Sequence, residues 1–292
     1  MLDLSWVAKF ARGPTETTVA RAKSLHENVR ALLGEVDYDT LLQGSYRTGT
    51  ALADMNDVDI LAIKQGADLG ALRSGKSQAW ATLFGEVEKR LDANPSYAGK
   101  WNRGDKCIRL ETGVHIDIVP AVSCGESGTD PIAIYSLGAK KVRKNWPRGH
   151  YDNAASKNAA TNGNFKPAVR LFKRWATCQF GDKKTAPSYY IQCLLYSLPD
   201  SIFTGDLAQD FVTIAKVILD RHGVPGGYSF RRLPRIAGEG DLFTPSEWDG
   251  NAFESFEAGL RASLPFAERA LAEQEADRAR AAWRMAFAGF DG

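Results

Sequence analysis

The sequence predicts an α+β protein, with a mixed sheet covered by helices in its N-terminal half and a helical bundle in its C-terminal half. The N-terminal half contains runs of alternating, β-branched residues, and helix-like periodicity prevails after about residue 151. The chain has 292 residues, enough for two domains of ordinary size. We therefore predict a division into residues 1–150 and 151–292.

The N-terminal half alternates between the two kinds of element. An apolar stripe with helical spacing follows Pro14, and Thr112-Gly113 is typical of a hairpin turn. The predicted elements are a long helix over 15–33, strands near 39–43 and 57–63, a helix over 76–92, and paired strands near 106–111 and 114–119.

The C-terminal half shows helical patterns separated by short breaks. The predicted helices cover 165–179, 187–198, 205–221, 248–262 and 264–288. The last of them, from Pro265 to Phe287, is rich in Ala, Glu and Arg, which predicts an exposed closing helix.

Composition fits a soluble enzyme. The hydrophobic fraction of 44% can build a core, and the net charge of +2 means that any attraction for phosphates must come from local clusters. The four cysteines show no metal-binding spacing, which favours free thiols in a reducing compartment. No signal sequence or 18-residue apolar run is present, so we predict a cytoplasmic protein that makes no contact with a membrane.

The most informative segment begins at Gln43-Gly44-Ser45 and continues to Asp57-Val58-Asp59. Successive side chains of a strand alternate between faces, so Asp57 and Asp59 are expected on one face. Two like charges side by side cost stability, which a bound divalent cation offsets, and Mg²⁺ prefers carboxylate oxygens plus substrate phosphates. Gly44 lets the backbone approach a phosphate, and the Ser45 hydroxyl adds a donor. A solvated acid pair at a sheet edge is the alternative.

This order of residues resembles the signature of the polymerase-β-like nucleotidyltransferases, in which Gly-Ser and Asp-hydrophobic-Asp form the metal and triphosphate site. The resemblance implies a polymerase-β-like core and a third carboxylate on a later strand. The candidate is Asp117, within the alternating run from Val114 to Val119 and before Pro120, which is expected to end the strand. Three carboxylates can hold two metal ions about 3.5–4 Å apart. A surface-facing Asp117 is the alternative.

A second motif competes with this interpretation. Residues 70–77, from Gly70 to Lys76-Ser77, match the phosphate-binding P-loop pattern. That motif requires a loop that joins a buried strand directly to a helix, whereas polar residues separate Ile63 from Gly70. We therefore expect Lys76 and Ser77 to open an ordinary helix.

Positive charge is concentrated between residues 140 and 174. This stretch holds ten cationic side chains against one acid, Asp152. A solvated basic face and a binding surface for triphosphate or nucleic acid explain it equally well.

Two segments in and after this region narrow the resemblance to the cGAS/DncV-like nucleotidyltransferases (CD-NTases), relatives of the oligoadenylate synthetases. They are Ala168 to Trp175 and Ala186 to Leu195. The resemblance implies that Lys173 reaches the donor triphosphate, that Ser188 hydrogen-bonds it, and that Tyr189 stacks on the base. Gln192 stands where the family often has an acid. A solvated Lys173 and a core aromatic Tyr189 are the alternatives.

The resemblance also implies the metal ions, the substrate contacts and the product of the reaction. Two Mg²⁺ ions, for which Mn²⁺ can substitute, would be held by Asp57, Asp59 and Asp117, with substrate bound by Gln43, Gly44, Ser45, Lys173, Ser188 and Tyr189. The product would be a cyclic di- or trinucleotide, or a short oligonucleotide, made from NTPs such as ATP and GTP with release of pyrophosphate. It would act as a second messenger in bacterial antiphage defence by binding a separate effector.

Other activities remain open. The same fold could transfer a nucleotide to RNA, a protein or a small molecule; a P-loop NTPase would use Lys76; and a non-catalytic nucleotide-binding module would have no need of three clustered acids. The tail, Ala286 to Gly292, is small and is predicted to be flexible. A terminal glycine also suits C-terminal conjugation machinery, which acts on some relatives, although an ordinary frayed end is the alternative.

Overall fold

Strand pairing and packing divide the chain into two units. The computed structural model describes residues 3–55, 57–66, 69–125, 130–181, 185–222, 233, 235–238, 240 and 248–290. One unit is Pro14–Asp152, and the other combines Met1–Gly13 with Asn153–Gly292. The predicted division placed the first residues with the sheet. They instead belong to the helical unit, because Val7 and Phe10 are buried in its core.

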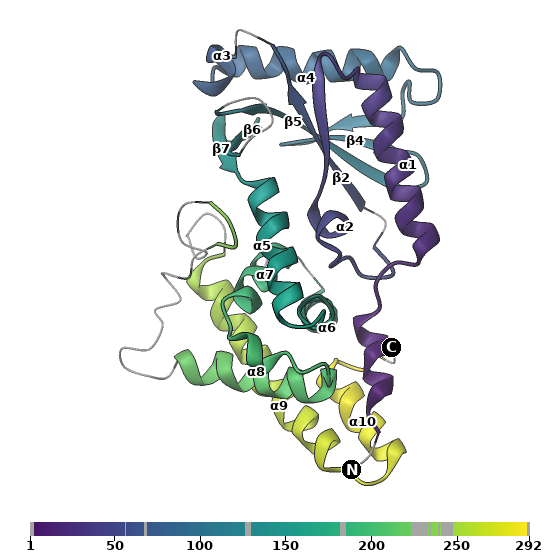
Figure 1. Cartoon of the computed structure of the whole chain (residues 1–292), viewed down its shortest axis with the longest axis vertical. Helices are drawn as coiled ribbons and strands as arrows, with labels where there is room; N and C mark the ends of the chain where they lie inside the picture. The colour runs from purple at the N-terminus through teal and green to yellow at the C-terminus, as the bar shows by residue number, and fades with distance from the viewer. Residues whose placement is uncertain are drawn as a thin grey trace. The chain divides into compact units, whose positions relative to one another are not determined.

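The first unit is built on a mixed sheet, shown in Figure 1, whose described strands number seven. They are β1 (Tyr38–Gln43), β2 (Asp57–Lys64), β3 (Trp101–Arg103), β4 (Ile108–Glu111), β5 (His115–Ser123), β6 (Ile132–Ser136) and β7 (Lys141–Asn145). Their order is β1-β2-β5-β4-β3, with β6 paired to both β5 and β7. Only β2 and β5 among the described pairs run parallel. The predicted α+β class is confirmed, whereas β3, β6 and β7 were not predicted.

Pro120 does not end its strand as predicted. β5 continues to Ser123, and Pro120 stays in register with Ala62 of the parallel neighbour. On the opposite edge, pairing with β4 stops at Ile118 and pairing with β6 starts at Ala121. Pro120 therefore falls between two antiparallel partners, where a missing N–H donor is tolerated.

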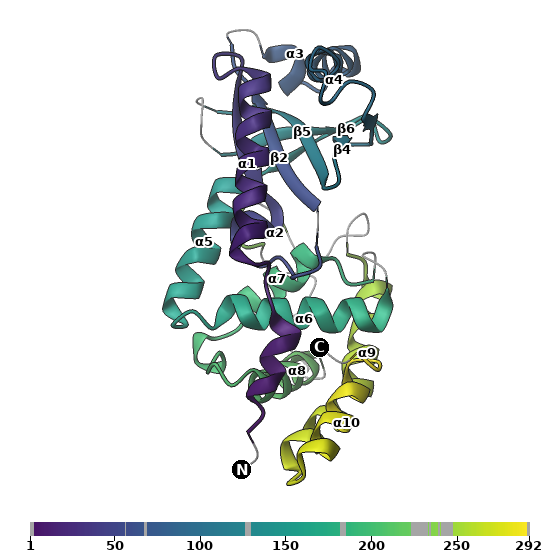
Figure 2. The same cartoon turned by 90° about the vertical axis from the view of Figure 1, so that its right-hand side faces the viewer.

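Helices cover one face of the sheet. α1 (Glu16–Leu33) and α4 (Ser77–Asp92) lie across it in Figures 1 and 2, and the side chain of Thr15 caps α1 by accepting from the N–H of Thr18 at 3.2 Å. The unit also contains the short helices α2 (Gly44–Thr48) and α3 (Gly70–Arg73). The helix-covered face is apolar: the core holds Val29, Leu33, Trp80, Phe84, Val58, Ile60, Ile116 and Ile118.

The second unit is helical. Its elements are η1 (Ser5–Ala11), the main part of α5 (Pro147–Ala160), α6 (Phe165–Phe180), α7 (Ser188–Tyr196), η2 (Asp200–Ile202), α8 (Leu207–His222), α9 (Gly250–Ala272) and α10 (Ala276–Ala286). Trp175 of α6 is fully buried, and its indole N–H donates to the hydroxyl of Ser263 at 2.9 Å. Within the residues described, no helix is long and apolar enough to span a membrane.

The C-terminal segment differs from its prediction in two ways. α9 runs through Pro265 and ends only at Ala272, because buried residues on both sides of the proline, Leu260 and Ala267, hold the helix together. The closing helix was predicted to be exposed, and most residues of α10 are exposed, although one face of it, with Trp283, is buried. The tail was predicted to be flexible, whereas Phe287 is fully buried and Phe290 packs against the same core. Gly292, the predicted conjugation site, lies outside the described residues.

The N-terminal segment should therefore stabilise the helical unit. Phe10 is 1% exposed, and its ring lies 4.8 Å from that of Phe287. Phe10→Ala should lower the free energy of unfolding of this unit by about 3–4 kcal/mol, through lost burial and the cavity left behind. Denaturant unfolding followed by tryptophan fluorescence measures this, since Trp6 and Trp283 adjoin Phe10. Lys9→Ala, at an exposed neighbouring position, should change it by less than about 0.5 kcal/mol. Equal effects would contradict this packing.

Candidate active site

Two neighbouring strands, β2 and β5, carry the predicted acids. Asp59 of β2 is in register with Asp117 of β5 on one side and with Gln43 of β1 on the other. Asp57 lies two residues before Asp59, on the same face of the strand. Val58 and Ile60 are buried on the helix-covered face, so the acids occupy the opposite face. The predicted alternation at residues 57–60 is confirmed.

Gly44 lies directly against one of these acids. A Cβ atom at this position would stand 2.2 Å from Oδ2 of Asp59, too close for any side chain, and Gly44 has φ +68°. Glycine is therefore required twice, once by the backbone conformation and once by the approach of the carboxylate. Ser45 follows it in α2 and is partly exposed.

Hydrogen bonds fasten α2 to the segment that leads into β2. The Ser45 carbonyl accepts from the N–H groups of Thr50 and Ala51, at 2.9 and 3.1 Å. The buried hydroxyls of Thr48 and Thr50 lie 2.9 Å apart, and the Tyr46 hydroxyl donates to the Met55 carbonyl at 2.7 Å. These bonds fix Gly44 and Ser45 relative to the strand that carries Asp57 and Asp59.

Arg109 of β4 lies beside Asp117, on the side away from Asp59. It lies opposite Asp117 in the antiparallel pair β4–β5. Its Nε and Nη2 atoms donate to Oδ1 and Oδ2 of Asp117, each at 2.8 Å. This contact raises the pKa of the Arg109 guanidinium, so the cation stays charged. Both oxygens of Asp117 are thereby engaged.

Cys107 adjoins the acids from β4's side. Burial, reinforced by the nearby charge of Asp117, raises the pKa of the Cys107 thiol to about 11. The thiol is therefore neutral beside the carboxylates and adds no further negative charge to the row of acids.

The donor set suits a hard divalent cation such as Mg²⁺. It consists of the three carboxylates of Asp57, Asp59 and Asp117 on one sheet face, and Mg²⁺ binds such groups together with substrate phosphates. In the arrangement described, no three acidic, histidine or cysteine side chains of the described residues converge into a ready cage. In the same arrangement both oxygens of Asp117 are bonded to Arg109.

Lys173 lies in the helical unit, two turns before the end of α6. It is only 4% exposed, so it is not the solvated helix residue that was the alternative. The N-terminus of α6 is held by two side chains of the preceding helix: Thr161 Oγ1 accepts from the N–H of Phe165, and Asn158 Oδ1 from that of Lys166. Contact of Lys173 with a donor triphosphate remains a prediction.

Ser188 and Tyr189 open α7, which packs against α6. Ser188 is the first helical residue after Pro187 and is partly exposed. The ring of Tyr189 packs against the helical core and lies edge-on to Tyr190, with centroids 5.4 Å apart. Burial raises the pKa of the Tyr189 hydroxyl, with a smaller contribution from Cys193. These contacts are those of a core aromatic residue, and base stacking by Tyr189 remains a prediction.

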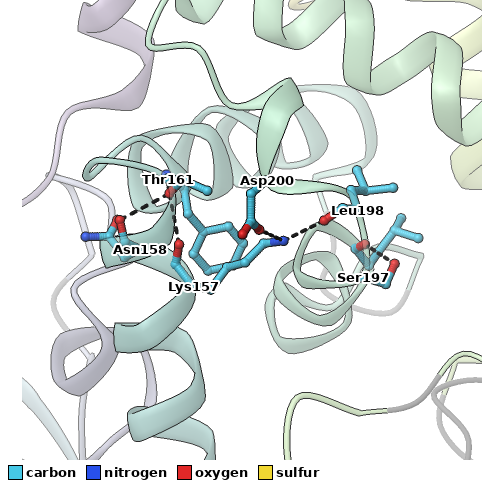
Figure 3. A network of polar contacts seen from close by, with 8 residues as sticks. Lys157, Asn158, Thr161, Ser197, Leu198 and Asp200 are labelled. Carbon is cyan, nitrogen blue, oxygen red and sulfur yellow. Dashed lines mark hydrogen bonds and ion pairs between the residues drawn. The ribbon is translucent and has the colours of Figure 1, made fainter.

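At least three of the cations between residues 140 and 174 contact oxygen atoms of the protein. Figure 3 shows Lys157 turned inward, where its ammonium contacts the Leu198 carbonyl and the carboxylate of Asp200. Arg148 pairs with Asp39 at 2.9 Å, and Arg170 donates to the Ala11 carbonyl at 2.6 Å. Several of the ten cations therefore stabilise the fold.

The P-loop match does not have P-loop structure. Gly70–Arg73 forms the short helix α3, and Lys76 is the exposed residue that precedes α4. The hydroxyl of Ser77 lies 2.6 Å from that of Tyr135, within the fold. Ser77 begins α4, as predicted, whereas the short helix α3 was not predicted.

Sequence reasoning missed Arg109 and the Thr48–Thr50 pair. A signal for Arg109 existed, because the turn at Thr112-Gly113 folds β4 back onto β5 and brings residues 109 and 117 face to face. Pairing them required exact strand register, which the sequence pattern leaves open by one or two residues. Nothing in the spacing marks the two threonines.

Comparison with known proteins gives the family. The cGAS/DncV-like nucleotidyltransferase C-terminal helical domain matches residues 152–264. The chain is 30% identical over 236 residues to the cyclic UMP-AMP synthase of Rhodothermus marinus, covering 71% of this chain and 81% of that enzyme. It is 25% identical over 296 aligned positions to the cyclic AMP-AMP-AMP synthase of an Acinetobacter species, covering 93% and 80%.

A solved structure agrees with these similarities. The Rhodothermus marinus CdnE c-UMP-AMP synthase, solved with Apcpp and Upnpp, superposes with a TM-score of 0.70 at 25% identity, over 89% of this chain and 96% of that one. The superposition and the match of the helical domain point to the same family. The chain is an enzyme that belongs to the cGAS/DncV-like nucleotidyltransferases.

Proposed function

We propose that this enzyme joins nucleoside triphosphates, ATP and GTP among them, into a cyclic di- or trinucleotide or a short oligonucleotide and releases pyrophosphate. The observation that carries the proposal is the in-register pair Asp59–Asp117, with Asp57 on the same face and Gly44 against Asp59. The names of the relatives, a cyclic UMP-AMP synthase and a cyclic AMP-AMP-AMP synthase, support the class of product. The product would serve bacterial antiphage signalling through a separate effector.

The acids would hold two Mg²⁺ ions, for which Mn²⁺ can substitute. When bound, the ions would stabilise charge on the triphosphate and lower the pKa of the attacking ribose hydroxyl. We assign removal of that proton to a carboxylate oxygen of Asp117. The bare Cα of Gly44 leaves room beside Asp59, and the hydroxyl of Ser45 can donate to a phosphate oxygen. Catalysis by these residues is chiefly positioning.

The helical unit would supply the remaining contacts to the donor nucleotide. Lys173 carries a positive charge on α6, and such a charge can bind a triphosphate through a charge-assisted hydrogen bond. Ser188 is partly exposed at the start of α7, where its hydroxyl can hydrogen-bond the same ligand. Gln43 ends β1 beside Asp59 and is a further candidate contact.

The first test of the function is direct. Purified protein with all four NTPs and Mg²⁺ or Mn²⁺ should yield a phosphatase-resistant cyclic product, detected by mass spectrometry. Replacing both Asp57 and Asp59 with Asn should abolish it, while the cation-free melting temperature stays equal or rises because like-charge repulsion is removed. Asp277→Asn, at a side chain that is 99% exposed, should keep full activity. Synthesis by the double variant would refute the proposed metal site.

Gly44 provides a sharper test of geometry. Gly44→Ala should reduce kcat by about a hundredfold, because displacing Asp59 by about an ångström disturbs the positioning of the reacting groups. The matched control is Gly99→Ala: Gly99 has φ +69°, close to the +68° of Gly44, but no atom lies within 4 Å of the added Cβ. Both variants carry similar backbone strain. If they lost activity equally, strain rather than the displacement of Asp59 would be responsible.

Single substitutions of Lys173 and Lys76 distinguish the proposed nucleotide-binding site from a P-loop. Lys173→Ala should raise the KM for NTP about tenfold, since a charge-assisted contact to phosphate contributes to ground-state binding. Lys76→Ala, at an exposed position, should leave kcat and KM within about twofold of their original values. Steady-state pyrophosphate release measures both constants, and melting curves check that Lys173→Ala is folded. The reverse pattern would favour a P-loop enzyme.

A further inference from the structure

Arg109 lies where a cation bound by the acids would have to compete with it. Its guanidinium occupies both carboxylate oxygens of Asp117 through two parallel hydrogen bonds of 2.8 Å. Such forked contacts are the strongest that arginine makes with a carboxylate. The side chain of Asp117 is 18% exposed, and that of Arg109 is 49% exposed. The contact between Arg109 and Asp117 is therefore partly shielded from water, although about half of the Arg109 side chain faces solvent.

Two further carboxylates lie on the same sheet face as the Arg109–Asp117 pair. Asp59 is in register with Asp117 on the adjacent strand, and Asp57 shares their face. Three carboxylates on one sheet face repel one another, and Arg109 supplies a positive charge at the end of the row. A divalent cation would supply the same compensation, but it needs the oxygens that Arg109 holds.

We propose that Arg109 is an intramolecular competitor of the metal: it holds Asp117 when no cation is bound, and it must release that carboxylate before a divalent cation can use it. The inference rests on the proposed function, in which Asp117 is a metal ligand. Arg109 is then a positioning residue that raises the cation concentration needed to assemble the site.

The sheet offers a matched control in Arg103. It forms the same kind of forked contact, from Nε and Nη2 to both oxygens of Glu88 on α4. Glu88 is buried among the helices, and Arg103 is in register with Ile108, a residue of the helix-covered core. This pair therefore belongs to the face opposite the acids. Its loss removes one positive charge from the sheet without freeing a proposed metal ligand.

The test measures binding of Mn²⁺ alone, without nucleotide, by electron paramagnetic resonance of the free ion. Arg109→Gln keeps a polar side chain but removes the charge, and it should bind Mn²⁺ about fivefold more tightly than wild type, the scale expected for a partly exposed ion pair. Arg103→Gln should differ from wild type by less than twofold. Adding Asp57→Asn and Asp59→Asn to Arg109→Gln should abolish the gain, which locates the ion at the acids.

Arg109→Lys distinguishes occupation of Asp117 from charge alone. It keeps the positive charge but loses the forked geometry, so its Mn²⁺ affinity should lie between those of wild type and Arg109→Gln. Circular dichroism verifies the fold of each variant. Affinity unchanged in Arg109→Gln, or equal in Arg109→Lys and wild type, would overturn the proposal.

The two proposals fail in distinguishable ways. If wild type makes the cyclic product and Arg109→Gln binds Mn²⁺ no more tightly, only the role of Arg109 is wrong. If no variant binds Mn²⁺ and wild type makes no product, the proposed function fails, and the role of Arg109 fails with it.

Discussion

The parallel pairing of β2 with β5 is the constraint from which the site follows. It places Asp59 beside Asp117, although 58 positions separate them in the chain (117 − 59). The pairing cannot shift by one residue, because a shift would turn acids toward the helices and expose Val58 and Ile60. Burial of apolar side chains under α1 and α4 thus fixes the position of charges on the opposite face.

Three carboxylates on one face of the sheet repel one another, which costs stability. The residues at the two ends of this row of acids, Gly44 and Arg109, accommodate the carboxylates in different ways. Gly44 gives the Asp59 carboxylate space by having no side chain. Arg109 binds Asp117 and supplies positive charge. The hydrogen bonds of Thr48 and Thr50 hold α2, and with it Gly44, in place. One end of the site is therefore fastened through backbone and threonine hydrogen bonds, whereas the other end is held by a half-exposed arginine side chain.

Local patterns predicted much of this from sequence, and long-range packing supplied the rest. The alternation at residues 57–60 follows from strand geometry, and Thr15 marks the start of α1. The parallel register of β2 and β5 could not be derived, because no turn connects them. The burial of Phe10 depends on Phe287, some 277 residues away (287 − 10), and a short 3₁₀ segment has no periodicity to signal it. The continuation of α9 through Pro265 likewise depends on tertiary packing, which overrode the local signal of a proline.

The basic stretch shows how charge clustered in sequence can disperse in space. Lys157, Arg148 and Arg170 are each engaged with oxygen atoms of the protein. Binding to a nucleic acid backbone requires many cations that are free to meet successive phosphates. Because these three cations are already engaged with oxygen atoms of the protein, they are not free in this sense, and the net charge of the whole chain is only +2.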